Sequence, residues 1–390
     1  MKIANRLSEI APFRVMELLA RANELAEDGH DVIHLEVGEP DFETPGPIVS
    51  AGIQALQNGV TRYSDARGTP ALRQQISSFY ELSLGVSVSP DRIFVTAGAS
   101  GGLLLLCALL MNPGENLLMT DPGYPCNRHF LASFNAQGIL VPVTAAENYQ
   151  LTPELIDTYW NTQSRGVLVA SPANPTGSVL GRDDIGALSA KVLSLGGFLM
   201  VDEIYQGLVY ENPVSTNDRA TSVLQIEPEA IVINSFSKYF GMTGWRLGWI
   251  VVPPALTVPL EKLAQNLFIC PSAIAQEAAL AAFSTESITI MEAQKAEFSR
   301  RRNFLVPALQ GLGFDIPLMP AGAFYVYAGL PENIEDAESF CKKLLEDEYV
   351  AITPGTDFGF HRADRFVRIS YARELAQLEE AVRRLRRALR

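Results

Sequence analysis

A chain of 390 residues is long enough for two or three domains around a sizeable core. Hydrophobic residues at 47% and charged residues at 19% are typical of an ordered globular protein and exclude a largely disordered one. The formal net charge of −13 argues against nucleic-acid binding through a broad basic surface, because that binding depends on neutralising phosphates.

Targeting and redox features are sparse along the chain. The most apolar run, Gly101 to Met111, falls far short of the roughly 20 residues that a spanning helix needs, and no signal-peptide pattern opens the sequence. We therefore expect a cytoplasmic enzyme with no membrane partner. The four cysteines are widely separated and form no CxxC pair, so we expect reduced structural thiols and no metal site.

The first two thirds of the chain alternate between helical and strand patterns. Residues 13–28 have helical spacing and precede a strand candidate over 31–37 and a loop, Gly38-Glu39-Pro40-Asp41-Phe42. The predicted helices that follow cover 47–58, 69–83, 101–111, 124–137 and 183–195. The predicted strands cover 92–97, 116–120, 139–143, 166–170, 198–202, 230–235 and 246–252. Nearly all-apolar strands alternating with helices predict an α/β fold whose mostly parallel sheet is covered by helices.

The pattern changes toward the C-terminus. A long helical run over about 287–311 is followed by strands and helices of a smaller α+β unit, at 322–328, 335–347, 350–352 and 365–370, and by a terminal amphipathic helix. We expect a large domain over 46–290 and a small domain over 291–390, and we expect the N-terminal segment over 1–45 to become part of the small domain.

The most informative stretch runs from Ser235 to Gly248, directly after a predicted strand. Lys238 there falls at the carboxyl edge of the sheet, where open α/β folds place their ligands. Ser235, Ser237 and the guanidinium of Arg246 offer hydrogen-bond donors suited to a phosphate. A lysine alone would be a solvated loop residue, but a lysine beside a phosphate site suggests pyridoxal 5'-phosphate (PLP).

This stretch resembles the cofactor-lysine signature of the class I/II aminotransferases, which belong to the PLP fold type I superfamily. The resemblance implies that Lys238 is catalytic and holds PLP as a Schiff base. It also implies that Asp202, at the end of a predicted strand, pairs with the pyridine nitrogen and keeps it protonated. Tyr205 would donate its phenol to the 3-oxygen of the ring. In Ser171-Pro-Ala-Asn174-Pro-Thr-Gly177, the Asn174 amide would touch that oxygen and the substrate carboxylate.

Four further positions match cofactor contacts of the family. Ala99 and Ser100 join a strand to a helix, so backbone amides at the helix N-terminus and the Ser100 hydroxyl could hold the phosphate. Tyr124 matches the aromatic residue that stacks on the pyridine ring, with core packing as the alternative. Tyr63 resembles the tyrosine that relatives send across a dimer interface to the neighbouring phosphate, so we expect a homodimer.

Two positions match substrate contacts. Arg368, on a predicted strand, corresponds to the arginine that binds the α-carboxylate bidentately. Gly38 lies in the early loop that closes over the substrate in relatives, with a plain turn as the alternative. Since one branch of relatives has a lysine at the place of Ser100, the serine leaves aspartate specificity open.

The resemblance therefore implies an aminotransferase that moves the amino group of an L-amino acid to a 2-oxo acid by a ping-pong route. A C–S β-lyase of the same fold stays an alternative, because one carbanion has several fates on this fold. An aminotransferase-like sensor without catalysis is the alternative from another class.

Overall fold

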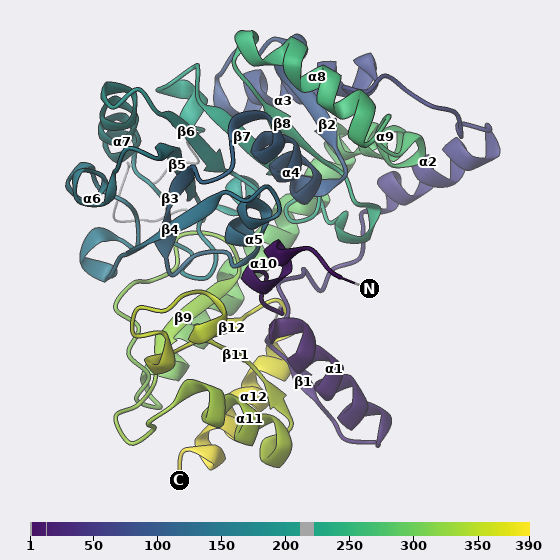
Figure 1. Ribbon diagram of the computed structural model, residues 1–390. Coiled ribbons are helices and arrows are strands. Elements are labelled where there is room, and N and C mark those ends of the chain that lie inside the picture. The colour runs from purple at the N-terminus through teal and green to yellow at the C-terminus, as the bar shows by residue number, and fades with distance from the viewer. Residues whose placement is uncertain (1, 13, 211–221) are drawn as a thin grey trace.

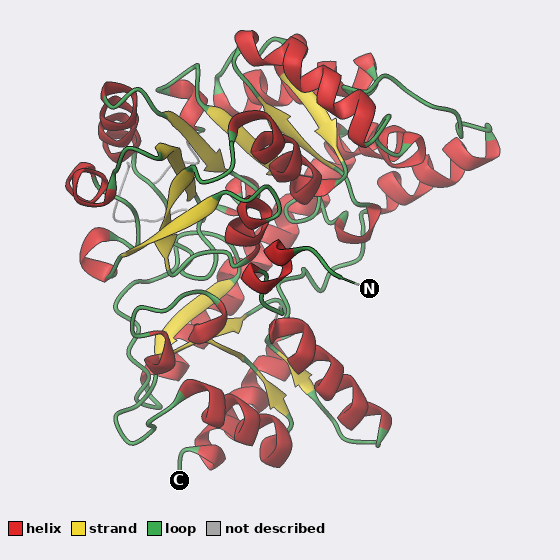
Figure 2. Cartoon of the chain, viewed as in Figure 1, coloured by secondary structure: helices red, strands yellow, loops and turns green. Residues whose placement is uncertain are grey.

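The computed structural model describes residues 2–12, 14–210 and 222–390, and its largest element is a seven-stranded sheet (Figures 1 and 2). In spatial order the strands are β2 (Ile93–Thr96), β8 (Gly248–Val251), β7 (Ile231–Ser235), β6 (Phe198–Asp202), β5 (Ser164–Ala170), β3 (Asn116–Asp121) and β4 (Gln137–Pro142). Neighbouring strands are parallel except at β8, which runs antiparallel to both β2 and β7. The predicted α/β fold with a mostly parallel sheet is confirmed.

Helices cover both faces of this sheet, as its all-apolar strands require (Figure 2). Ile93 and Val95 of β2 pack into one apolar core and Phe94 into another, because successive strand side chains point to opposite faces. The first core is closed by α2 (Gly46–Gln57), α3 (Pro70–Leu84), α6 (Pro153–Tyr159), α7 (Arg182–Ser194) and α9 (Ala273–Leu280). The second core is closed by α4 (Gly98–Leu110), α5 (Cys126–Ala132) and α8 (Pro254–Leu267).

The C-terminal part forms a second group of elements with the N-terminal helix (Figure 1). Its antiparallel sheet has the order β11 (Thr353–Pro354), β12 (Phe366–Ser370) and β9 (Tyr325–Gly329). A parallel pair joins β1 (Ile33–His34) to β10 (Val350–Ala351), so the N-terminal segment lies against the C-terminal part. The helices of this group are α1 (Arg14–Glu27), α11 (Ala337–Glu348) and α12 (Leu375–Ala388).

The long helix α10 (Thr285–Gln310) links the two groups. The domain boundary expected at 290/291 falls inside this helix, and the division into a large and a small domain stays a prediction. In the described part of the chain, no helix is long and apolar enough to cross a membrane.

The structure corrects some predicted elements. The helix expected over 124–137 is only α5, because the chain leaves it through a turn in which Asn135 has a φ of 57° before β4 begins. The strand expected over 31–37 is reduced to the two residues of β1.

Candidate active site

Twelve of the thirteen residues expected at the site line one cavity of about 260 Å³ at the carboxyl edge of the large sheet. They are Gly38, Ala99, Ser100, Tyr124, Asn174, Asp202, Tyr205, Ser235, Ser237, Lys238, Arg246 and Arg368. Strands β2, β3, β5, β6 and β7 all end at this edge, whereas the antiparallel β8 begins there, just after Arg246. Arg368 comes from β12 and Gly38 from the loop after β1, so the cavity lies between the two groups of elements.

Lys238 follows the end of β7 and points into the cavity. Its Nζ donates a hydrogen bond to the backbone carbonyl of Gly38 and lies 5.7 Å from the centre of the Tyr205 ring. Burial lowers the pKa of Lys238 to about 8, with Glu39 opposing the shift and the Arg368 charge adding to it. Lys238 therefore becomes a free amine at a lower pH than a solvated lysine does.

Asp202 ends β6 and is 4% exposed. Its Oδ1 accepts the backbone N–H of Ile204 at 3.1 Å. Burial raises the pKa of Asp202 to about 7, while the Ile204 N–H and the Lys238 charge oppose the shift. A buried carboxylate of this kind fits a partner that carries positive charge on a ring nitrogen, since such a charge would stabilise its ionised form.

Tyr205 forms a buried pair with a residue that the sequence reasoning missed. The two phenol oxygens of Tyr205 and Tyr325 are 2.7 Å apart, and burial raises the pKa of Tyr205 well above its ordinary value. Tyr325 begins β9 and approaches the Gly38 loop so closely that a Cβ on Gly38 would lie 2.3 Å from its oxygen. No local pattern marks Tyr325, because its importance comes from a contact 120 positions away along the chain.

The part of the cavity near Arg246 and the start of α4 carries hydrogen-bond donors that suit an anion. Arg246 adopts a left-handed backbone conformation, with a φ of 53°, and its guanidinium lies against Gly98 at the start of α4. The first N–H groups of α4, including those of Ala99 and Ser100, have no partners within the helix. Ser237 lies nearby, and its backbone N–H donates to the Ser235 hydroxyl at 3.0 Å. These donors fit a phosphate group.

Arg368 also lines the cavity and is 2% exposed. Its Nη1 donates to Asn174 Oδ1 at 3.0 Å, and its Nη2 donates to the backbone carbonyl of Glu36. The Tyr325 and Phe358 rings lie 4.4 Å and 4.6 Å from the guanidinium carbon. Nε is buried without a hydrogen-bond partner among the described residues. A fixed guanidinium of this kind suits a planar carboxylate.

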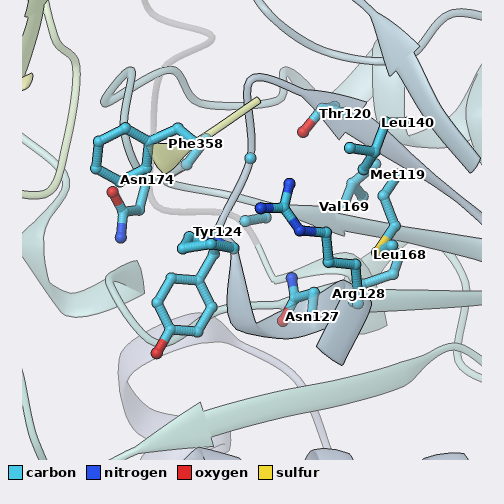
Figure 3. Close-up of a pocket in the computed structure, with 14 residues that line it drawn as sticks. Met119, Thr120, Tyr124, Asn127, Arg128, Leu140, Leu168, Val169, Asn174 and Phe358 are labelled. Atoms are coloured by element: carbon cyan, nitrogen blue, oxygen red, sulfur yellow. The ribbon is translucent and has the colours of Figure 1, made fainter. Parts of the chain in front are cut away.

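Tyr124 lines both the main cavity and a smaller one of about 20 Å³, which Figure 3 shows. Arg128 of α5 extends into the smaller cavity, which Asn174 and Phe358 also line. Burial raises the pKa of Tyr124 well above its ordinary value. The ring therefore stays a neutral phenol at one wall of the main cavity.

Tyr63 is the one expected site residue that does not line the cavity of its own chain. Its side chain is 82% exposed. Sequence reasoning also missed several lining residues on the N-terminal side, namely Val15, Met16, Val37 and Glu39. Apolar positions on a helix are ordinarily assigned to a core, so nothing in the sequence of α1 distinguishes Val15 and Met16 from packing residues.

A buried aspartate, a lysine of lowered pKa and a phosphate-sized set of donors, all at the carboxyl edge of this sheet, define a PLP-dependent enzyme of fold type I. The chain belongs to the family described as aminotransferase class I and II, whose pattern matches residues 30–385. It is therefore an aminotransferase, and PLP is its cofactor.

Related proteins support this assignment over almost the whole chain. The chain is 37% identical to the valine–pyruvate aminotransferase of Mycobacterium tuberculosis, over 96% of each sequence. It is 35% identical to the (5-formylfuran-3-yl)methyl phosphate transaminase of Methanocaldococcus jannaschii, over 99% of each sequence. Among solved structures, the aspartate aminotransferase of Thermus thermophilus with maleate matches with a TM-score of 0.92 at 30% identity, covering all of both chains.

Proposed function

We propose that this aminotransferase moves the amino group of an L-amino acid with an uncharged side chain to a 2-oxo acid with an uncharged side chain by a ping-pong route. The observation that carries the proposal is that Lys238, Asp202 and Arg368 line a single cavity. We assign the substrate side chain to the part of this cavity that Val15, Met16 and Val37 line. Because these residues are apolar, they favour a substrate without a second charge.

In this proposal Arg368 binds the α-carboxylate of the substrate through its guanidinium, and Asn174 orients that arginine. Lys238 would take the proton from the substrate α-carbon as general base and deliver it to the carbon of the cofactor's carbonyl group. The lowered pKa of Lys238 supports this role, because a base with a pKa near the working pH is both available and effective.

The cofactor would be held at four points. Arg246, Ser237 and the N-terminus of α4 would bind its phosphate, and Asp202 would pair with its ring nitrogen. Tyr205 would donate its phenol to the ring oxygen, and Tyr124 would lie against the ring face. When bound, PLP supplies an electron sink for the negative charge that develops at the substrate α-carbon.

The neutral substrate class rests on the charges around the cavity. Among its described lining residues the cations are Lys238, Arg246 and Arg368, and the proposal gives each of them a role. The side near α1 offers Val15, Met16 and Val37, together with the acidic Glu39. A distal carboxylate would therefore lose its hydration without gaining a cation from this chain. The name of the mycobacterial relative, a valine–pyruvate aminotransferase, supports the same substrate class.

A panel of amino donors with pyruvate and 2-oxoglutarate as acceptors tests this proposal. We expect valine or another neutral donor to exceed aspartate in kcat/KM by about tenfold or more, which corresponds to a difference of about 1.4 kcal/mol in transition-state binding. Lys238→Ala is the control and should abolish turnover. Aspartate or glutamate as the best donor would contradict the substrate class. Pyruvate and ammonia formed without an acceptor would instead indicate a β-lyase.

We also propose that the chain forms a homodimer in which Tyr63 serves the neighbouring active site. Exposed apolar side chains support such an interface, because Ile53 and Leu56 of α2 are more than half exposed, as is Ile269 after α8. Tyr63 adjoins this surface, since the next residue, Ser64, donates its backbone N–H to the sulfur of Cys270. The cytoplasmic location expected from the sequence remains a prediction.

A further inference from the structure

We infer that Asp357 is a positioning residue that holds the first turn of α1 over the substrate side of the cavity. The inference rests on the proposed function only for its kinetic consequence, because the anchoring itself can be measured without turnover. Asp357 ends the short turn Gly355–Asp357 between β11 and β12 and is 4% exposed. Its Oδ1 accepts the backbone N–H of Arg14, the first residue of α1, at 3.2 Å.

This hydrogen bond satisfies a backbone N–H at the start of α1. The first N–H groups of a helix have no acceptor within it, and a carboxylate there also complements the helix dipole. The next two residues, Val15 and Met16, are the ones that line the cavity. At the other end of α1, Ala22 and Leu25 pack against Leu345 and Ala351. Asp357 therefore fixes the end of the helix that carries the lining residues.

The same turn contacts the arginine that we assign to the substrate carboxylate. Phe358, the residue after Asp357, places its ring 4.6 Å from the guanidinium carbon of Arg368. One turn of chain thus connects the first turn of α1, which covers the substrate side of the cavity, to Arg368. A shift of Asp357 would move both the α1 end and the ring that supports this guanidinium.

The charges around Asp357 support an ionised carboxylate in this place. Burial raises its pKa, and the positive charges of Arg368, Arg14 and Arg128 oppose the shift. Oδ2 is buried with no hydrogen-bond partner in the described part of the chain. Arg128 extends from α5 into the small cavity that Phe358 lines (Figure 3). Its guanidinium carbon lies 5.2 Å from the Phe360 ring. The positive charges of these three arginines therefore favour the ionised form of the carboxylate that accepts the Arg14 N–H.

The experiment compares Asp357→Ala with Asp357→Asn in the holoenzyme. The asparagine retains an oxygen that can accept the Arg14 N–H, whereas the alanine removes it. We expect Asp357→Ala to raise KM for the amino donor about tenfold, from loss of a buried hydrogen bond to a charged group, and to leave the absorbance of the bound cofactor unchanged. Asp357→Asn should keep KM within about threefold of the unchanged protein. Arg14→Ala tests the side chain separately: it removes the contacts of that side chain with Glu338 and Thr356, leaves the backbone N–H, and should raise KM less than Asp357→Ala does.

Limited trypsin digestion gives a readout that needs no catalysis. Release of the α1 end in Asp357→Ala should speed cleavage after Arg14 and Arg21, detected by mass spectrometry, whereas Asp357→Asn should be cleaved as slowly as the unchanged protein. If Asp357→Ala fails to fold, the asparagine variant and Met16→Ala still decide the question, since loss of the cover should raise KM for the donor in Met16→Ala. The inference is overturned by an unchanged KM and cleavage rate in Asp357→Ala, by equal effects of alanine and asparagine, or by an unchanged KM in Met16→Ala.

Discussion

At the scale of single residues, the site depends on charged groups removed from water. Lys238 and Asp202 approach each other in pKa, at about 8 and about 7, because burial lowers the first and raises the second. The protonation states of both groups can therefore change near neutral pH when a charged cofactor binds. A solvated lysine and aspartate would be fully charged there and would respond little.

The lowered pKa of Lys238 predicts how the cofactor-free protein takes up PLP. Only the free amine can form the covalent bond, so the capture rate should rise with pH, pass its midpoint near the pKa of about 8 and then level off. Stopped-flow absorbance at a series of pH values measures this rate. Asp202→Asn is a useful control, because a permanently neutral neighbour should leave the midpoint at or below 8. A rate that still climbs steeply above about pH 9.5, as for a solvated lysine, would refute the prediction.

Substitution of Arg368 should weaken the reaction with substrate and leave cofactor binding unchanged. Arg368→Lys keeps the positive charge but loses the planar fork that matches a carboxylate and donates to Asn174. We expect kcat/KM to fall by roughly 10- to 100-fold, corresponding to a lost charge-assisted hydrogen bond. Steady-state kinetics with the best donor measures the loss, and the cofactor absorbance should stay as in the unchanged protein. A full kcat/KM in Arg368→Lys would show that this arginine does not bind the carboxylate.

At the scale of elements, the junction between β2 and α4 sets the shape of the phosphate end. Gly98 has a φ of 68°, and a Cβ at this position would lie 2.6 Å from Arg246 Nη2. Gly98→Ala should therefore strain the backbone and displace the guanidinium, weakening PLP binding by about tenfold or more. Titration of the cofactor-free protein with PLP measures this change. Gly244→Ala is the matched control, because nothing lies within 4 Å of the Cβ it would add, and it should bind PLP almost normally.

The sequence predicts the elements of the large sheet well, because each strand is a short continuous apolar run after a helix or turn. Helix α8 was not predicted, since Pro253, Pro254 and Pro259 suggest a break, yet Pro254 occupies the first helical turn, where a missing N–H costs little. The site residues at the strand ends could be predicted because parallel strands end at one edge. Tyr325 and Asp357 could not be predicted, because their roles come from contacts with Tyr205 and Arg14 that are 120 and 343 positions away.

At the scale of the whole molecule, the position of Tyr63 is the feature that one chain does not explain. The side chain lies outside the cavity of its own chain and is 82% exposed. It also stands beside apolar side chains that a monomer would leave in water. A dimer through this surface would bury those side chains and carry Tyr63 to the neighbouring site, where its hydroxyl could donate to the phosphate.

Mixed dimers test this arrangement, after sedimentation has established that the chain is dimeric. Tyr63→Phe alone should weaken PLP binding by roughly 10- to 100-fold, from loss of a hydrogen bond to a charged group. In a dimer of a Tyr63→Phe chain with a Lys238→Ala chain, one site has an intact lysine and receives an intact tyrosine from its neighbour. At limiting PLP this mixed dimer should show about half the wild-type activity, although each parent is impaired. The matched control pairs a wild-type chain with the double variant, whose only intact lysine would receive phenylalanine, so that dimer should stay impaired. The opposite pattern, an active control and an impaired mixed dimer, would mean that Tyr63 serves its own chain.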